Sequence, residues 1–281
     1  QLGLLAAAVA FYAFLSFVPM LAAVVMTYGL VGDPEMVNAH MRTVTGLVPG
    51  EAAQLVNQQL LGLVSAAKSE TGFGLVVALA FAIYGATRAS SAIIEALNMV
   101  YRETEARGFL AFYRVSFGIT LATILLVTAG IVAASILGLV EDFAAEIGGG
   151  TTFLLKTATW LGAALLVSLV FATIYRFAPN RRRARWQWLT AGSVGATLVW
   201  LLATFAMSLY VSRVGGYNET YGSLGAVVVF LLWLFVSSLV ILVGAQLNAE
   251  AELQTTADTT VGAPAPAGRR GATVADEVSE D

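Results

Sequence analysis

The sequence predicts an all-α membrane protein, folded as a bundle of six transmembrane helices. Of its 281 residues, 58% are hydrophobic and only 12% are charged, against about 25% charged residues in a typical soluble domain. The charges are also segregated, because six stretches of 17 to 32 residues contain no Asp, Glu, Lys, Arg or His. A helix crosses the hydrocarbon core of a bilayer, about 30 Å thick, with roughly 20 apolar residues. Stretches of this length favour helices over the short alternating strands of a membrane barrel.

The composition excludes several classes of protein. A water-soluble helical protein would place charges on its outer face every turn or so, and these stretches carry none. The chain has no cysteine, which excludes a secreted disulfide scaffold. Its net charge of −3 excludes a generally basic nucleic-acid binder, so we expect no nucleic-acid partner. The chain begins with Gln rather than Met, and we expect the natural start to lie upstream.

We expect the six helices at these positions, in chain order: 4–30, 71–97, 112–139, 153–178, 187–211 and 221–249. The second helix is the least hydrophobic. Its charge-free part, residues 71–87, is at the lower limit for a span, and Arg88 follows directly. The long Arg side chain can extend back toward the interface, so the helix is still expected to cross.

The segments outside the helices predict the domain organisation. The first outer loop, about residues 31–70, should contain short amphipathic helices, because its apolar residues after Pro49 roughly follow helical spacing. After residue 253 the composition changes to Thr, Ala, Pro and Gly, which cannot bury a core. We therefore expect a transmembrane domain over residues 1–253 and a disordered tail over residues 254–281.

The distribution of Lys and Arg predicts the orientation. Eleven of them lie in one set of connections and the tail, and four lie in the other set. Connections rich in Lys and Arg stay in the cytoplasm. We therefore expect a multi-pass protein of the bacterial cytoplasmic membrane with both termini in the cytoplasm.

Weakly polar residues on three helix faces could line a pathway. In the first helix, Tyr12, Ser16 and Pro19 share one face, and Pro19 removes a backbone hydrogen bond near the middle of the span. The fifth and sixth helices carry the other candidates: Thr190, Ser193, Thr197, Trp200, Thr204 and Ser208, with Ser237, Gly244 and Asn248. Two interpretations are open. The faces either line a polar interior, or they are helix contacts, where small residues allow close packing.

Two further clusters lie outside the apolar stretches. A polar stripe after the second span follows spacings of three and four residues: Arg88, Ser91, Glu95, Asn98 and Arg102. It lines a cytoplasmic vestibule in one interpretation and is a solvated juxtamembrane face in the other. The second cluster contains four arginines next to a tryptophan: Arg181, Arg182, Arg183 and Arg185. It suits contact with the anionic lipids of the inner leaflet.

The sequence offers no pattern of residues for a metal, a cofactor or catalysis. His40 is the only histidine, cysteine is absent and the acids are scattered, so no cluster has the spacing of metal ligands. No catalytic triad or phosphate-binding loop can be assembled. No acid lies in the middle of a span, where proton relays usually have one. We expect no metal, no cofactor and no enzyme activity.

Four motifs cover most of the chain: FYAFLSFVP, YGATRASSAIIEALNMVYRE, FAPNRRRARWQWLTAGSVGA, and YNETYGSLGAVVVFLLWLF with GAQLNAE. Together they resemble the YihY/virulence factor BrkB family of bacterial inner-membrane proteins, formerly labelled ribonuclease BN. The resemblance implies six helices, two cytoplasmic ends and a transport or envelope-associated role. The closing motif of the family resembles GAELNAE, and Gln246 replaces its acid here.

These observations favour a transporter, exporter or lipid-handling translocator of unknown substrate. A pathway of hydroxyls and aromatics without fixed charge suits an amphipathic or lipid-like cargo better than a small ion. The expected partners are membrane lipids and that cargo, and a homo-oligomer is left open. The alternative is a non-transporting membrane scaffold that recruits envelope-associated partners through the arginine cluster and the tail. Ribonuclease activity does not fit, because RNA cleavage needs metal ligands or general acid–base groups.

Overall fold

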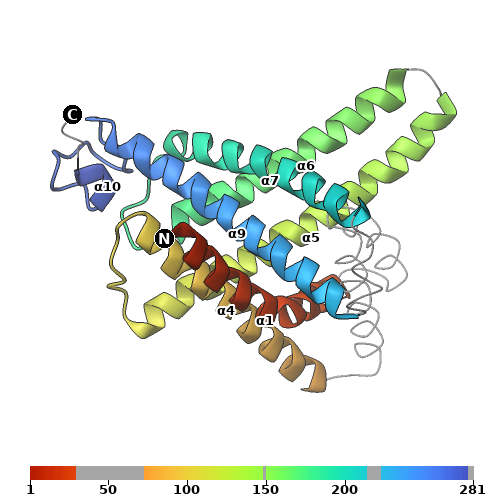
Figure 1. Ribbon diagram of the computed structural model, residues 1–281, viewed down its shortest axis with the longest axis horizontal. Helices are drawn as coiled ribbons and strands as arrows, with labels where there is room; N and C mark the ends of the chain where they lie inside the picture. The colour runs from red at the N-terminus through yellow and green to blue at the C-terminus, as the bar shows by residue number, and fades with distance from the viewer. Residues whose placement is uncertain (30–72, 148–149, 214–222, 278–281) are drawn as a thin grey trace.

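The computed structural model describes residues 1–29, 73–147, 150–213 and 223–277 (Figure 1). Over these ranges the regular structure is helical, with one isolated β-bridge between Ala184 and Thr260. The helices are α1 (Leu2–Gly29), α4 (Phe73–Val100), α5 (Phe109–Ile147), α6 (Gly150–Phe177), α7 (Gln187–Arg213), α9 (Ser223–Leu253) and the short α10 (Thr273–Asp276). The predicted all-α class is confirmed. The amphipathic helices expected within residues 31–70 lie outside the described residues.

Four helices contain a segment long and apolar enough to cross a membrane: Phe109–Leu126, Phe153–Phe177, Gln187–Tyr210 and Gly225–Leu253. In α1 a shorter apolar segment covers Leu2–Phe17. Both α1 and α4 are 28 residues long, about 42 Å at the rise of an α-helix. The protein is therefore a helical membrane protein with several apolar helices, of which four meet both criteria within the described part of the chain.

The six long helices contact one another in a cyclic order: α1 with α4, then α5, α6, α7 and α9, which contacts α1 again. In addition, α4 contacts α9 across this ring. The hairpin of α5 and α6 extends away from the other helices at the upper right of Figure 1. With 39 residues, α5 is about 58 Å long. It continues past the charge-free stretch because Glu141 and Asp142 end the apolar segment without ending the helix.

Glycines allow the closest approaches between helices. At Gly85 in α4 an added Cβ would lie 2.6 Å from the Pro19 Cβ in α1. At Gly192 in α7 it would lie 2.2 Å from the Gly244 backbone oxygen in α9. Both distances are far inside van der Waals contact. Small residues at such crossings let backbones pack closely, which is how helices associate where lipid removes the hydrophobic drive.

Residues 254–277 are ordered, and the prediction of a disordered tail is wrong over this range. Arg270 is buried and donates hydrogen bonds to the backbone carbonyls of Thr256, Ala257, Ala265 and Ala275. A polar segment without a large core can fold when one buried guanidinium satisfies several carbonyls at once. The composition of the tail could not reveal these bonds.

Asp258 is a second side chain, besides Arg270, that joins parts of the tail through several hydrogen bonds. Its carboxylate accepts hydrogen bonds from the backbone N–H and the hydroxyl of Thr260 and from the Ala265 N–H, at 2.7 to 2.9 Å. Burial alone would raise the pKa of Asp258, but these hydrogen bonds lower it to about 2. The carboxylate of Asp258 therefore stays ionised at neutral pH, and the three hydrogen bonds that it accepts within the tail are kept.

Candidate functional site

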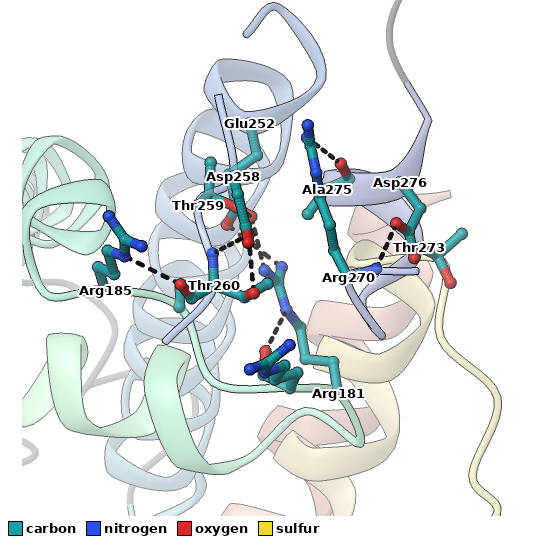
Figure 2. A network of polar contacts seen from close by, with 12 residues as sticks. Arg181, Arg185, Glu252, Asp258, Thr259, Thr260, Arg270, Thr273, Ala275 and Asp276 are labelled. Carbon is teal, nitrogen blue, oxygen red and sulfur yellow. Dashed lines mark hydrogen bonds and ion pairs between the residues drawn. The ribbon is translucent and has the colours of Figure 1, made fainter. Parts of the chain in front are cut away.

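The arginine cluster and the tail form one structure, which we call the arginine cap and define as residues 178–186 and 252–277. Figure 2 shows its central contacts. The Arg185 N–H donates to the Thr259 oxygen at 2.8 Å, and the Val261 N–H donates to the Arg183 oxygen at 2.9 Å. The Arg182 N–H donates to the Gly271 oxygen at 2.8 Å. The connection between α6 and α7 is therefore joined to the tail by its backbone.

At the centre of the arginine cap lies a buried ion pair between Arg181 and Glu252 (Figure 2). The two guanidinium nitrogens reach the two carboxylate oxygens at 3.2 and 2.5 Å. The side chains are only 3% and 0% exposed. Thr259 donates a third hydrogen bond to Glu252 at 2.7 Å, and Arg181 lies 5.0 Å from the centre of the Tyr101 ring. The prediction that Arg181 contacts lipid is wrong, because an internal carboxylate holds it.

The other three arginines of the cluster differ in how accessible their side chains are for contact with lipid. Arg185 is half-buried and its Nε donates to the Thr260 oxygen at 2.9 Å. Arg182 is half-buried too, and its guanidinium lies against Gly262. Arg183 is exposed and stacks on Phe177 at 4.9 Å. Lipid contact remains a proposal for these three side chains, with Arg183 the most accessible.

The predicted vestibule stripe divides into buried and exposed members. Ser91 is buried and shares a 2.9 Å hydrogen bond with Ser116 of α5. Asn98 is buried, donates to Glu105 at 2.8 Å and accepts from the Asn180 N–H at 2.7 Å. These two residues therefore connect α4 to its neighbours and do not lie on an open surface.

The remaining stripe residues, Arg88, Glu95 and Arg102, are exposed. Arg102 ends α4 in a left-handed conformation with φ of 56° and pairs with Glu277 of the tail at 2.9 Å. Arg88 binds two tyrosine hydroxyls, described below. The stripe is thus not one continuous lining.

The candidate faces of α7 and α9 meet each other. Trp200 donates to the Ser237 hydroxyl at 3.0 Å, and the Gly192 N–H donates to Asn248 at 2.8 Å. Gly244 lies against Gly192 as described above. Thr204 accepts from Trp233 of α9 at 3.4 Å. These residues form the helix contact that was one of the two open interpretations.

The other predicted pathway residues do not share one environment, because some are buried and others are exposed. Ser193 and Thr197 are buried, and Thr197 bonds back to the Ser193 carbonyl at 2.8 Å. Thr190, Ser208 and Tyr12 are exposed. Ser16 is buried, and its hydroxyl has no hydrogen-bond partner.

A buried polar group at the base of the arginine cap brings Asn248 together with two tyrosines that the sequence analysis missed. Tyr101 and Asn248 are both fully buried, and the Tyr101 hydroxyl and the Asn248 Nδ2 lack a hydrogen bond of good geometry. Burial raises the pKa of Tyr101, so the hydroxyl remains protonated. Tyr175 completes the group and donates to the Ile241 oxygen at 2.8 Å. Tyr101 stands near the end of the second of the four motifs, but nothing in the sequence marked it as buried.

Among the described residues, no group of three or more His, Cys, Asp or Glu could hold a metal ion. Gln246, which replaces the acid of the closing motif, donates to Glu250 one turn later at 2.6 Å.

The family model described as virulence factor BrkB matches residues 1–269. The chain belongs to the virulence factor BrkB family. The match includes the arginine cluster, Glu252 and the tail as far as Arg269, so the larger part of the arginine cap falls within the BrkB region, and residues 270–277 lie beyond it. The resemblance noted from the four motifs is confirmed.

Two BrkB-family relatives can be compared over most of their length. The ribonuclease-like protein YfkH of Bacillus subtilis is 26% identical over 209 residues, which cover 72% of this chain and 70% of YfkH. A UPF0761 membrane protein of Idiomarina loihiensis is 26% identical over 216 residues, covering 76% of this chain and 72% of the relative. No solved structure matches the chain.

Proposed function

We propose that this BrkB-family protein is a six-span inner-membrane translocator that moves an amphipathic or lipid-like molecule, without an enzymatic step. In this proposal α1 and α4 are the two further spans. Their length of 28 residues each exceeds what a bilayer core needs. The arginine cap and both termini lie in the cytoplasm, as the excess of Lys and Arg on that side indicates.

The observation that carries the proposal is the attachment of the α5–α6 hairpin. It contacts α4 along α5 and α7 along α6, and Figure 1 shows it diverging from the other helices. Hydroxyl pairs lie at both attachments. Ser90 pairs with Thr120 at 2.8 Å and Ser91 with Ser116 at 2.9 Å on one side, and Ser168 pairs with Ser193 at 3.3 Å on the other. Hydrogen bonds of this kind between membrane helices contribute only about 0.6 kcal/mol each. A hairpin held in this way can move relative to the ring and admit a molecule from the bilayer side.

The exposed side chains of α6 support a lipid-like cargo. Trp160, Leu161 and Leu165 are all exposed and large, and they spread over about 140° of the helix at 100° per residue. Such a surface faces acyl chains rather than water. A small hydrophilic substrate would need a more polar lining.

A scaffold role is supported less well. Its predicted recruiting surface was the arginine cluster with the tail, and these two segments bind each other in the arginine cap. A partner would have to displace contacts that include a buried ion pair. The arginine cap therefore favours an internal role for this surface.

Cross-linking tests the translocator proposal directly, because the chain has no cysteine of its own. The variant S91C/S116C places two thiols where hydroxyls now lie 2.9 Å apart. In proteoliposomes, oxidation should slow the transbilayer movement of a fluorescent lipid analogue about tenfold, since gating motion sets such rates, and reduction should restore it. The S91C single variant is the control. If the unmodified protein moves no lipid, or if the cross-linked protein moves it at the same rate, the proposal is wrong.

A further inference from the structure

Arg88 lies deep in α4 for a charged side chain. It precedes Val100 at the end of the helix by 12 residues, which corresponds to about 18 Å along the axis. Its side chain is exposed on the outside of the bundle. Among the described residues, the three ion pairs all involve other arginines: Arg102, Arg107 and Arg181. An unpaired charge at membrane depth is costly and normally marks a functional site.

The partners of Arg88 are two tyrosines. Its NH2 group donates to the Tyr84 hydroxyl at 2.9 Å, and its NH1 group donates to the Tyr113 hydroxyl of α5 at 3.3 Å. The guanidinium carbon also lies 5.5 Å from the centre of the Tyr84 ring. A guanidinium carries five N–H donors, so three remain. Each tyrosine accepts through oxygen and keeps its own O–H to donate. The three side chains thus present a positive charge and a set of free donors, which suits an anion.

Aromatic side chains lie on both sides of this group: on the cap side Phe109 of α5 contacts the Tyr113 ring at 4.7 Å, and two more lie on the side away from the cap. Phe81 lies two turns before Arg88 on α4 and is 72% exposed, and Phe117 lies one turn after Tyr113 on α5 and is 44% exposed. Because α4 runs toward the arginine cap and α5 runs away from it, both rings lie farther from the cap than the polar group does. A bound molecule would place its polar end toward the cap and its apolar part toward the middle of the bilayer.

We propose that Arg88, Tyr84 and Tyr113 bind the phosphate head group of an anionic lipid-like amphiphile from the inner leaflet. The inference rests on the proposed function and names the chemical class of its cargo. The planar guanidinium pairs with two phosphate oxygens at once, and the two hydroxyls donate to the same group. Phe81 and Phe117 then contact the acyl chains. This orientation is the one that a lipid of the cytoplasmic leaflet already has.

Binding to the full-length protein in detergent tests the proposal. The probes are a short-chain phosphatidylglycerol, the diacylglycerol with the same chains, and inorganic phosphate, with affinities measured by titration calorimetry. Phosphatidylglycerol should bind at least about tenfold more tightly than the other two, because charge-assisted hydrogen bonds and acyl contacts both contribute. R88Q should lose this preference, Y84F/Y113F should weaken it a few-fold, and R88K should fall between. R269Q removes an exposed tail arginine and should bind as the unmodified protein does.

Several results would overturn the inference. Equal affinities for phosphatidylglycerol and diacylglycerol would show that the phosphate is not recognised, and equal affinities for phosphatidylglycerol and inorganic phosphate would indicate a site for a free anion. If R88Q fails to fold, the Y84F/Y113F variant decides, and an unchanged affinity there contradicts the proposal. The binding assay is independent of transport. A selective site in a protein that moves no lipid would reject the translocator alone, whereas transport without selectivity would reject this inference alone.

Discussion

The E252Q variant should lose about 3 kcal/mol or more of stability, the largest effect expected for a single polar substitution in this protein. Glu252 is fully buried and forms both carboxylate contacts with Arg181. Removing its charge leaves the Arg181 guanidinium buried and unpaired, which typically costs 3 to 5 kcal/mol. The measurement is the thermal unfolding midpoint in detergent, together with the rate at which a protease cleaves the tail. The midpoint should fall and the tail should become susceptible.

Two further variants isolate the ion pair as the cause. R102A removes an exposed pair, 54% accessible on both sides, and should cost less than about 1 kcal/mol. The double variant R181M/E252L replaces the buried pair with apolar side chains and should recover most of the loss, because no unpaired charge is then buried. If E252Q were as stable as R102A, or if the double variant were worse than E252Q, the buried ion pair would not hold the arginine cap together.

The G192A variant should separate α7 from α9 and cost about 3 kcal/mol, at the upper end of what overpacking costs. A methyl group at Gly192 would lie 2.2 Å from the Gly244 oxygen and 2.4 Å from Asn248 Oδ1. The obstruction is backbone, so the helices must move apart and the hydrogen bond from the Gly192 N–H to Asn248 must lengthen. The thermal midpoint in detergent should drop, and α9 should exchange its amide hydrogens faster.

The matched control is Gly162, which lies within α6 and has nothing within 4 Å of an added Cβ. There G162A should be neutral or should stabilise the helix by up to about 1 kcal/mol, because alanine is the better helix former. Equal midpoints for G192A and G162A would mean that the close α7–α9 crossing does not exist in the folded protein.

Helix positions could be predicted because one physical quantity, the length of apolar chain, fixes them. The fifth expected helix, 187–211, and the observed α7, Gln187–Arg213, differ by two residues. The observed α5 ends at Ile147, eight residues after the expected end at residue 139. The expected end was too early because charged residues mark the edge of the bilayer and not the end of the helix. Within the described residues, four segments are long and apolar enough to cross a membrane, and the other two expected spans depend on the proposal above.

The arginine cap could not be predicted, because its contacts join segments about 70 residues apart. Arg181 was interpreted as part of a lipid-binding cluster, and Glu252, three residues beyond the last expected helix, received no interpretation. Arg270 looked like part of a disordered tail, yet it binds four carbonyls. Similarly, Asn248 was chosen as a pathway residue because it is polar, and its acceptor oxygen instead binds the α7 backbone. Polarity marked these side chains as ones that need a hydrogen-bonding partner but could not say which neighbour each would meet.

We propose above that this BrkB-family chain crosses the inner membrane with the arginine cap on the cytoplasmic side. The most direct test labels single cysteines with a membrane-impermeant maleimide, before and after the cytoplasmic membrane is permeabilised. Thr104 and Arg269 are exposed positions on the cap side of the molecule, so T104C and R269C suit the experiment. Both cysteines should be labelled only after permeabilisation. Labelling of either residue in cells with an intact inner membrane would contradict it.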